Sequence, residues 1–171
     1  MSVQRYPLAG VTVVSLEQAV AAPYATRQLA DLGARVIKVE RPGGGDFARR
    51  YDTTVHGHSS YFVWLNRSKQ SLTLDIKDPR GREILHELLD GADVFVQNLA
   101  PGAAGRLGLD AATVTGRRPG LIPCTISGWG TTGPWWSSPC RSTTSPGRGA
   151  TVWSPGWTTT SSRRRSPSWP G

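Results

Sequence analysis

Residues 11–46 constrain the fold of this chain more than any other part of the sequence. They begin with a β-branched run at residues 11–16, which is typical of a strand. Pro23 follows, at a place where the first turn of a helix tolerates a residue without an N–H group. Gly33 offers the left-handed cap that ends a helix, and residues 35–40 have the composition of a second strand. This order predicts a βαβ unit with a right-handed crossover.

Three more strands are predicted farther along the chain. Residues 71–76 alternate polar and apolar side chains, and residues 93–97 and 121–127 are two further apolar runs. Pro123 places the last run at a sheet edge or a bulge, because proline cannot donate to the hydrogen-bond ladder. The apolar run at residues 61–65 fits either a strand or a buried helix end, and periodicity does not decide between them.

A second helix is predicted to begin after Asp78, a good N-cap residue that precedes a proline, and to end at Gly91. Its buried stripe is expected to hold Ile84, Leu85, Leu88 and Leu89, and the first helix is expected to present Ala25, Leu29 and Leu32 on one face. Strands that alternate with helices predict an α/β protein with an open, mostly parallel sheet covered by helices on both faces. Ligands of such sheets bind beyond the carboxyl ends of the strands.

Charge divides the chain of 171 residues into two unlike parts. All 12 acidic residues and 13 of the 20 Lys and Arg residues lie at or before Asp110, so the formal net charge of +8 comes almost wholly from the later part. The two cysteines form neither a metal-ligand cluster nor a disulfide framework, and no apolar run approaches the roughly 20 residues of a membrane span. We therefore expect a cytoplasmic protein without a metal ion and without a membrane partner.

Six short motifs occur in order along residues 7–134. They are PLAG at residues 7–10, ADLGARVIKVE at 30–40, NRSK at 66–69, LDIK at 74–77, ADV at 92–94 followed by Asn98, and SGWGTTGP at 127–134. In their order and spacing these motifs resemble the family III CoA-transferases, the group that includes formyl-CoA transferase, carnitine CoA-transferase and the α-methylacyl-CoA racemases. The resemblance implies a Rossmann-like large domain, a smaller second domain and an interlocked homodimer.

The resemblance also implies where coenzyme A lies. The positions that contact CoA in the family would be Val20, Ala21, Arg41, Leu74, Asp75, Ile76, Lys77, Asn98, Leu99, Ala100 and Arg106. Most of these residues follow predicted strands, where the sheet itself predicts a ligand site. The cationic side chains Arg41, Lys77 and Arg106 suit the phosphate groups of CoA. Without the resemblance, solvated charges at strand ends would be the favoured interpretation of Arg41 and Lys77.

Transferases of this family use an aspartate that forms a mixed anhydride with the acyl group. The corresponding position falls near Thr158 or later, where this chain has no acidic residue, and the His and Asp pair of the racemases is missing because no histidine follows His86. We therefore expect no catalytic residue in this chain. The predicted parent activity moves CoA between an acyl-CoA thioester and a carboxylic acid. A racemase-type fragment and a non-catalytic CoA-binding fragment are the alternatives.

Residues 135–171 have the composition of a disordered, low-complexity basic tail, with five of the seven tryptophans among Ser, Thr, Pro, Gly and Arg. If the gene is GC-rich, most codons of residues 158–167 end in G or C. Reading them one base earlier then gives Asp-Asp-Asp-Val-Val-Ala-Ala-Ala-Val-Ala. This peptide has acidic residues in its first turn and would begin a helix well. We therefore interpret residues 1–134 as the N-terminal part of the large domain and the tail as frameshifted, so that the second domain and the homodimer are not expected. Nucleic-acid binding by Arg and stacking Trp side chains is the alternative interpretation of the tail.

Three other polar residues are expected to have ordinary structural roles. Glu17 and Asp31 lie near predicted helix ends and are expected to be caps or surface charges. Cys124 lies on a predicted strand without a visible base beside it, so we expect it in the core and not as a nucleophile.

Overall fold

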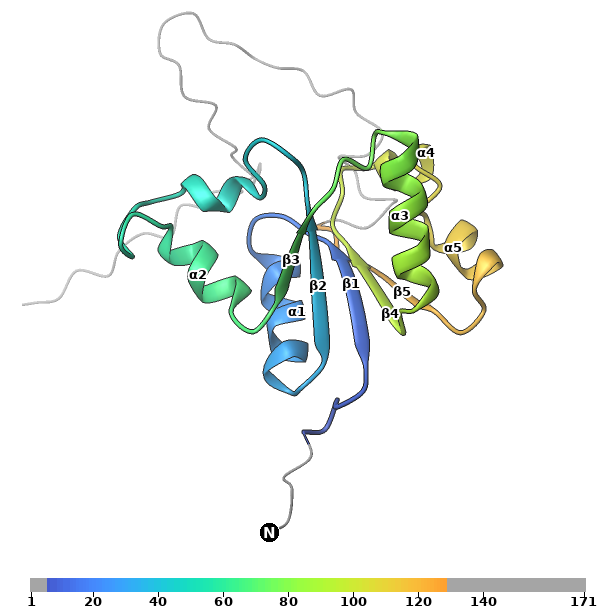
Figure 1. Ribbon diagram of the computed structural model, residues 1–171, viewed down its shortest axis with the longest axis horizontal. Helices are drawn as coiled ribbons and strands as arrows, with labels where there is room; N and C mark the ends of the chain where they lie inside the picture. The colour runs from blue at the N-terminus through green and yellow to red at the C-terminus, as the bar shows by residue number, and fades with distance from the viewer. Residues whose placement is uncertain (1–5, 129–171) are drawn as a thin grey trace, which may run out of the picture. The chain divides into compact units, whose positions relative to one another are not determined.

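The computed structural model describes residues 6–128 of the chain (Figure 1). The predicted tail at residues 135–171 and most of the SGWGTTGP motif lie outside these described residues. The strands are β1 (Thr12–Leu16), β2 (Arg35–Glu40), β3 (Gln70–Thr73), β4 (Val94–Gln97) and β5 (Ile122–Thr125). The helices are α1 (Ala21–Asp31), the 3-10 helix η1 (Phe47–Arg50), α2 (Ser60–Asn66), α3 (Pro79–Asp90), α4 (Ala103–Arg106) and α5 (Ala111–Arg117).

The five strands form one parallel sheet in the order β3-β2-β1-β4-β5. β1 lies at the centre, where Val14 pairs with Ile37 of β2 on one side and with Phe95 of β4 on the other. The chain therefore moves outward from β1 in one direction and then returns to the other side of it, which is the strand order of a Rossmann-like sheet. β5 is an edge strand, as its proline, Pro123, predicts.

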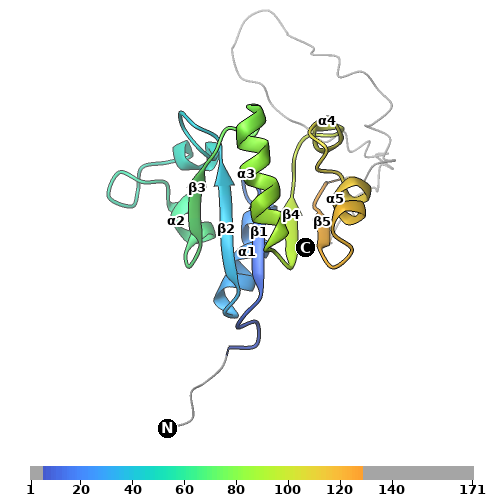
Figure 2. The same cartoon turned by 45° about the vertical axis from the view of Figure 1, so that its right-hand side comes forward.

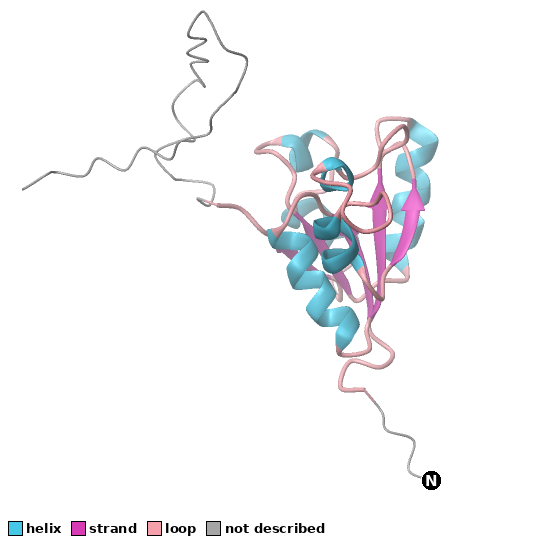
Figure 3. Cartoon of the chain, turned by 90° about the vertical axis from the view of Figure 1, so that its left-hand side faces the viewer, coloured by secondary structure: helices cyan, strands magenta, loops and turns pink. Residues whose placement is uncertain are grey.

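Helices cover both faces of the sheet, as predicted (Figures 2 and 3). In Figure 2, α3 lies in front of the sheet and α1 behind it. On the α3 and α5 side, Leu85, Leu89 and Val114 pack against sheet residues that include Phe95. On the α1 side the core contains Val13, Ala22, Ala30, Val36 and Val96. None of the described helices is long and apolar enough to cross a membrane.

Two predictions about helix faces were wrong in detail. The buried side of α1 runs through Ala22, Thr26 and Ala30, whereas Leu32 is 45% exposed beyond the end of the helix. In α3, Leu85 and Leu89 are buried but Ile84 is 45% exposed. α3 buries one row of residues, Gly81, Leu85 and Leu89, whereas α1 buries Pro23 and Arg27 beside its row of small residues.

The ambiguous apolar run at residues 61–65 is helical and forms most of α2. Ser59 caps this helix by accepting a hydrogen bond from the N–H group of Phe62 at 3.4 Å. Leu65 is the buried residue of α2, while Tyr61 and Trp64 are about half exposed. An N-cap serine at Ser59 was the signal that favoured a helix over a strand here.

Gly81 is expected to accept a side chain only at a cost in stability. A Cβ atom at this position would collide with the backbone carbonyl group of Asp75, in the segment that follows β3. We expect Gly81→Ala to lower the free energy of unfolding by about 1–3 kcal/mol, because this backbone must shift to admit the methyl group. Gly116 of α5 has open space around it, so Gly116→Ala should instead stabilise the protein by about 0.5 kcal/mol. Urea unfolding of the two variants measures both changes, and equal stability of the two would contradict the packing described here.

Candidate functional site

The predicted CoA-contacting residues all lie beyond the carboxyl ends of strands or on α4, which Figure 1 shows at the same end of the sheet. Val20 and Ala21 follow β1 and begin α1, and Arg41 follows β2 directly. Leu74, Asp75, Ile76 and Lys77 follow β3, and Asn98, Leu99 and Ala100 follow β4, while Arg106 ends α4. Segments that are far apart in the sequence thus meet at one edge.

Asn98 ties the end of β4 to the end of β1. Its side-chain oxygen accepts a hydrogen bond from the N–H group of Gln18 at 2.9 Å, and its amide NH2 group donates to the Gln18 carbonyl oxygen at 2.8 Å. β1 and β4 are adjacent strands from which the chain proceeds in opposite directions, and a crevice for ligands forms at such a point. Asn98 therefore holds together two of the segments that form the candidate site, those after β1 and β4.

Asp46 ties the segment after β2 to the segment after β1. One carboxylate oxygen, Oδ1, accepts hydrogen bonds from the N–H groups of Ala19 at 3.1 Å and of Ala48 at 2.9 Å. Ala19 has a backbone φ of +66°, a left-handed conformation that is uncommon for a residue with a side chain. The strained residue lies directly before Val20 and Ala21.

Glu40, the last residue of β2, closes the loop that carries Arg41. Its Oε2 atom accepts hydrogen bonds from the N–H group of Asp46 at 2.9 Å and from Nε of Arg49 at 2.8 Å. Its Oε1 atom accepts from Arg49 Nη2 at 2.7 Å and from the Ser71 hydroxyl at 2.8 Å. Residues 41–45 thus form a loop that begins directly after Glu40 and ends at Asp46, whose N–H group the Glu40 carboxylate binds.

The three predicted phosphate-binding cations are all exposed. Arg41 uses only its Nε atom within the loop, where it donates to the Gly45 carbonyl oxygen at 3.0 Å. Lys77 and Arg106 also have side chains in contact with solvent. The guanidinium ends of the arginines and the ammonium group of Lys77 are therefore available to an anionic ligand.

A buried cluster of charges lies under this edge, on the α1 side of the sheet. Lys69 Nζ lies 2.7 Å from Glu17 Oε1, and Lys38 Nζ lies 2.7 Å from Asp46 Oδ2. All four side chains are at most 2% exposed. The expectation that Glu17 is a cap or a surface charge was therefore wrong: its carboxylate also accepts a hydrogen bond from the Thr26 hydroxyl at 2.6 Å. Charges buried in this way persist because each has a partner of opposite sign.

Asn66 and an aromatic ring complete the surroundings of the two lysines. The Asn66 side-chain oxygen accepts hydrogen bonds from Lys38 at 2.9 Å and from Lys69 at 3.1 Å. The ring of Phe62 lies 5.2 Å from the Lys38 ammonium group and 3.7 Å from the Arg49 guanidinium carbon. Beside them is a cavity of about 150 Å³, lined by Lys38, Glu40, Arg49, Phe62, Asn66, Lys69, Gln70 and Ser71.

Burial and hydrogen bonding shift the pKa of two groups in this region. Burial raises the pKa of Glu40, but the hydrogen bonds from Arg49, the Asp46 N–H group and Ser71 outweigh it and bring the pKa to about 2. Burial lowers the pKa of Lys69 to about 8, although the adjacent Glu17 carboxylate opposes that shift. Glu40 is therefore ionised at every physiological pH.

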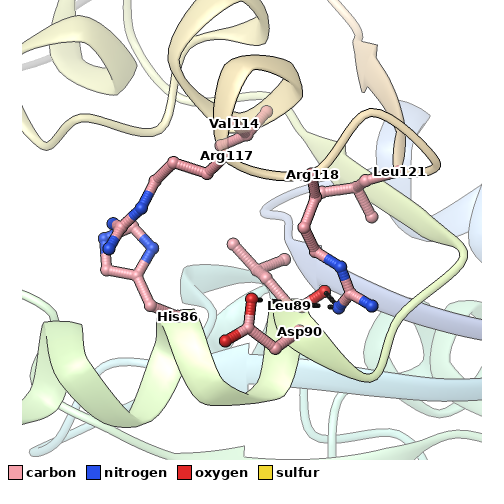
Figure 4. Close-up of a pocket in the computed structure, with 7 residues that line it drawn as sticks. All are labelled: His86, Leu89, Asp90, Val114, Arg117, Arg118 and Leu121. Carbon is pink, nitrogen blue, oxygen red and sulfur yellow. Dashed lines mark hydrogen bonds and ion pairs between the residues drawn. The ribbon is translucent and has the colours of Figure 1, made fainter.

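A second, much smaller hollow lies between α3 and α5 (Figure 4). Its volume is about 10 Å³, and its lining residues are His86, Leu89, Asp90, Val114, Arg117, Arg118 and Leu121. Burial lowers the pKa of His86, and the charge of Arg117 lowers it further. In Figure 4 the Arg117 side chain lies beside the His86 ring. A hollow of about 10 Å³ is too small for a ligand.

No three His, Cys, Asp or Glu side chains within residues 6–128 are placed to hold a metal ion together. Cys124 is exposed on β5, so the expectation that it belongs to the core was wrong. Its strand lies at the sheet edge, where side chains meet solvent.

A family model described as CoA-transferase family III matches residues 8–168 of the chain. The succinyl-CoA:glutarate CoA-transferase of Mus musculus is 46% identical over 129 residues, which are 75% of this chain and 30% of that protein. The acetyl-CoA:oxalate CoA-transferase of Acetobacter aceti is 41% identical over 128 residues, which are 75% of this chain and 33% of that protein. The chain thus spans about a third of the length of these curated relatives.

Solved structures with the same fold agree with these sequence matches. A CAIB/BAIF family protein from Brucella suis superposes with a TM-score of 0.71 at 39% identity, over 78% of this chain and 36% of that chain. A protein from Mycobacterium tuberculosis superposes with a TM-score of 0.71 at 38% identity, over 78% of this chain and 37% of that chain.

Proposed function

Because this chain belongs to CoA-transferase family III, we propose that its sheet supplies the CoA-binding part of an enzyme that moves CoA between an acyl-CoA thioester and a carboxylic acid. The observation that carries the proposal is the gathering of the predicted contacts at one edge of the sheet. The two relatives named above pair an acyl-CoA with a carboxylate, glutarate or oxalate, which favours a transferase over a racemase.

The chemistry of this edge suits the charged part of CoA. The first amide groups of a helix such as α1 have no partner within the helix and can donate to an anion or a carbonyl oxygen. Arg41 can pair with a phosphate group through the nitrogens that its loop leaves free, and Lys77 and Arg106 add positive charge. Val20 and Ala21 at the start of α1 would lie against the same ligand.

Three further parts of the proposal concern the whole protein. The 171-residue chain by itself does not turn over acyl-CoA, since no carboxylate or histidine follows Asp110 in its sequence. A small carboxylic acid is the second substrate, and a homodimer is not required for CoA to bind. The protein acts in the cytoplasm.

We also propose that residues 135–171 arise from a frameshift, which resequencing across the Pro134 codon would test.

The experiment for CoA binding compares two arginines at opposite ends of β2. We expect the 171-residue chain to bind CoA in an isothermal titration and Arg41→Ala to weaken that binding about tenfold, which is about 1.4 kcal/mol. Arg35 lies at the amino end of β2, where its Nε atom donates to the Gln70 side chain at 2.9 Å, so Arg35→Ala is the matched control. Equal losses in the two variants would indicate a nonspecific charge effect and would refute the site.

A further inference from the structure

We propose that Asp46 is a positioning residue for the CoA site: its carboxylate holds the segment after β1 in the conformation that presents Val20 and Ala21 to the ligand. The inference rests on the proposed function for its ligand, but its geometry does not. Asp46 is 2% exposed, and it lies at the start of η1, directly after the loop of Arg41. It can therefore couple the two segments that meet above β1 and β2.

The coupling passes through a single oxygen atom. Oδ1 of Asp46 receives the N–H groups of both Ala19 and Ala48, so the same atom caps η1 and anchors the segment after β1. Ala19 has a left-handed φ of +66°. A non-glycine residue persists in that conformation only where its surroundings hold it, and the hydrogen bond to Asp46 is such a restraint.

Asp46 is itself held by two residues of β2, Lys38 and Glu40. Its other oxygen, Oδ2, lies 2.7 Å from Lys38 Nζ, and its own N–H group donates to Glu40 at 2.9 Å. Lys38 comes from the middle of β2, a strand whose neighbours on both sides fix its position. Asp46 thus links the sheet to the segments after β1 and β2, and it holds Ala19 next to the residue Gln18 that Asn98 holds from the end of β4.

The position of Ala19 matters because α1 begins two residues later. If Ala19 leaves the left-handed region, the amide groups at the start of α1 change direction relative to β1. CoA that uses these groups would then lose its alignment, while Arg41 would remain able to attract its phosphates. We therefore expect Asp46 to act on affinity through geometry and not through contact with the ligand.

The test compares two aspartates that each accept a backbone N–H group from another segment. The Asp93 carboxylate accepts a hydrogen bond from the Thr12 N–H group at 2.8 Å, at the amino edge of the sheet. Asp93→Ala is therefore the matched control for Asp46→Ala. We expect Asp46→Ala to raise the dissociation constant of CoA at least tenfold at a temperature where circular dichroism shows both variants folded. Asp93→Ala should change that constant less than twofold.

Two further measurements separate positioning from general destabilisation. Asp46→Asn keeps one acceptor oxygen, and with that oxygen on the side of Ala19 and Ala48 its NH2 group faces the Lys38 ammonium group and cannot accept from it. This variant should therefore melt at a lower temperature and yet retain CoA affinity within about threefold. Amide hydrogen exchange on the unliganded wild-type chain should show the Ala19 N–H group protected, and Asp46→Ala should abolish that protection.

The possible failures are distinguishable. If the wild-type chain binds no CoA, the proposed function fails, while exchange at Ala19 still decides the role of Asp46. If CoA binds and Asp46→Ala binds it as tightly as Asp93→Ala does, the positioning role is overturned. Exchange of the wild-type Ala19 amide at the rate of an unprotected chain would overturn it as well, whether or not any variant folds.

Discussion

Replacing Glu17 by alanine is expected to lower the free energy of unfolding by about 3–5 kcal/mol, because the change leaves Lys69 buried without its charged partner. Glu17 accepts from Lys69 at 2.7 Å and from the Thr26 hydroxyl at 2.6 Å, and its side chain has no exposed surface. The measurement is urea unfolding of the wild-type and variant chains at pH 7.

An exposed ion pair supplies the control for this prediction. Asp90 is 72% exposed and its carboxylate lies 3.9 Å from Arg118, so Asp90→Ala should cost less than about 1 kcal/mol. The double variant Glu17→Leu with Lys69→Met removes both charges, and we expect it to be about 1–2 kcal/mol more stable than Glu17→Leu alone. Losses of similar size for Glu17→Ala and Asp90→Ala would show that the buried cluster does not exist.

Acid is expected to destabilise the protein through Glu40. Its pKa is about 2 in the folded protein, below the usual value of 4.5, so the unfolded chain takes up a proton at higher pH than the folded one. The stabilisation is complete above pH 4.5 and is lost as the pH falls toward 2, in total roughly 3 kcal/mol, of which about 2 kcal/mol is gone by pH 3. Urea midpoints measured from pH 6 to pH 3 follow this loss.

Glu40→Gln identifies the group responsible. The variant should be less stable than wild type at pH 6, because Arg49 and the Asp46 N–H group lose a charged acceptor. Its stability should then fall less steeply in acid, so that the two curves approach each other near pH 3. A constant gap between the curves from pH 6 to pH 3 would mean that Glu40 titrates normally.

The framework of the fold could be predicted because local signals and hydrophobic patterns agreed. The strand at residues 35–40 has the bounds expected. Asp78 caps the start of α3 and Gly91 caps its end, as their backbone preferences predict. The edge position of β5 follows from Pro123. Each of these conclusions needs only a few neighbouring residues, and that is why the sequence supports them.

The buried charges could not be assigned from local pattern alone, although one signal was present. Lys38 lies within an apolar strand of a parallel sheet, and such strands are buried on both faces. A lysine in that position requires a carboxylate partner, and Glu17, directly after the central strand, was one candidate. The actual partners, Asp46 and Glu17, depend on how the segments after β1 and β2 lie over the sheet.

The sequence places the candidate site at the carboxyl edge of the sheet but does not predict the contacts within it. The carboxyl edge of a parallel sheet is a ligand site in general, so Arg41 and Asn98 could be named from the order of the elements. The bond from Ala19 to Asp46 joins residues whose proximity depends on the left-handed turn at Ala19. Alanine gives no local indication of that conformation, and the coupling of the two loops was therefore missed.

Chemical-shift mapping of CoA onto the 171-residue chain tests the central claim most directly. With saturating CoA we expect the largest shifts at the amide groups after β1, β2, β3 and β4 and on α4, and little change at the amino ends of the strands. Shifts that saturate together at that edge would establish the site. Saturable shifts confined to the opposite edge of the sheet, or no saturable shifts at all, would contradict the account.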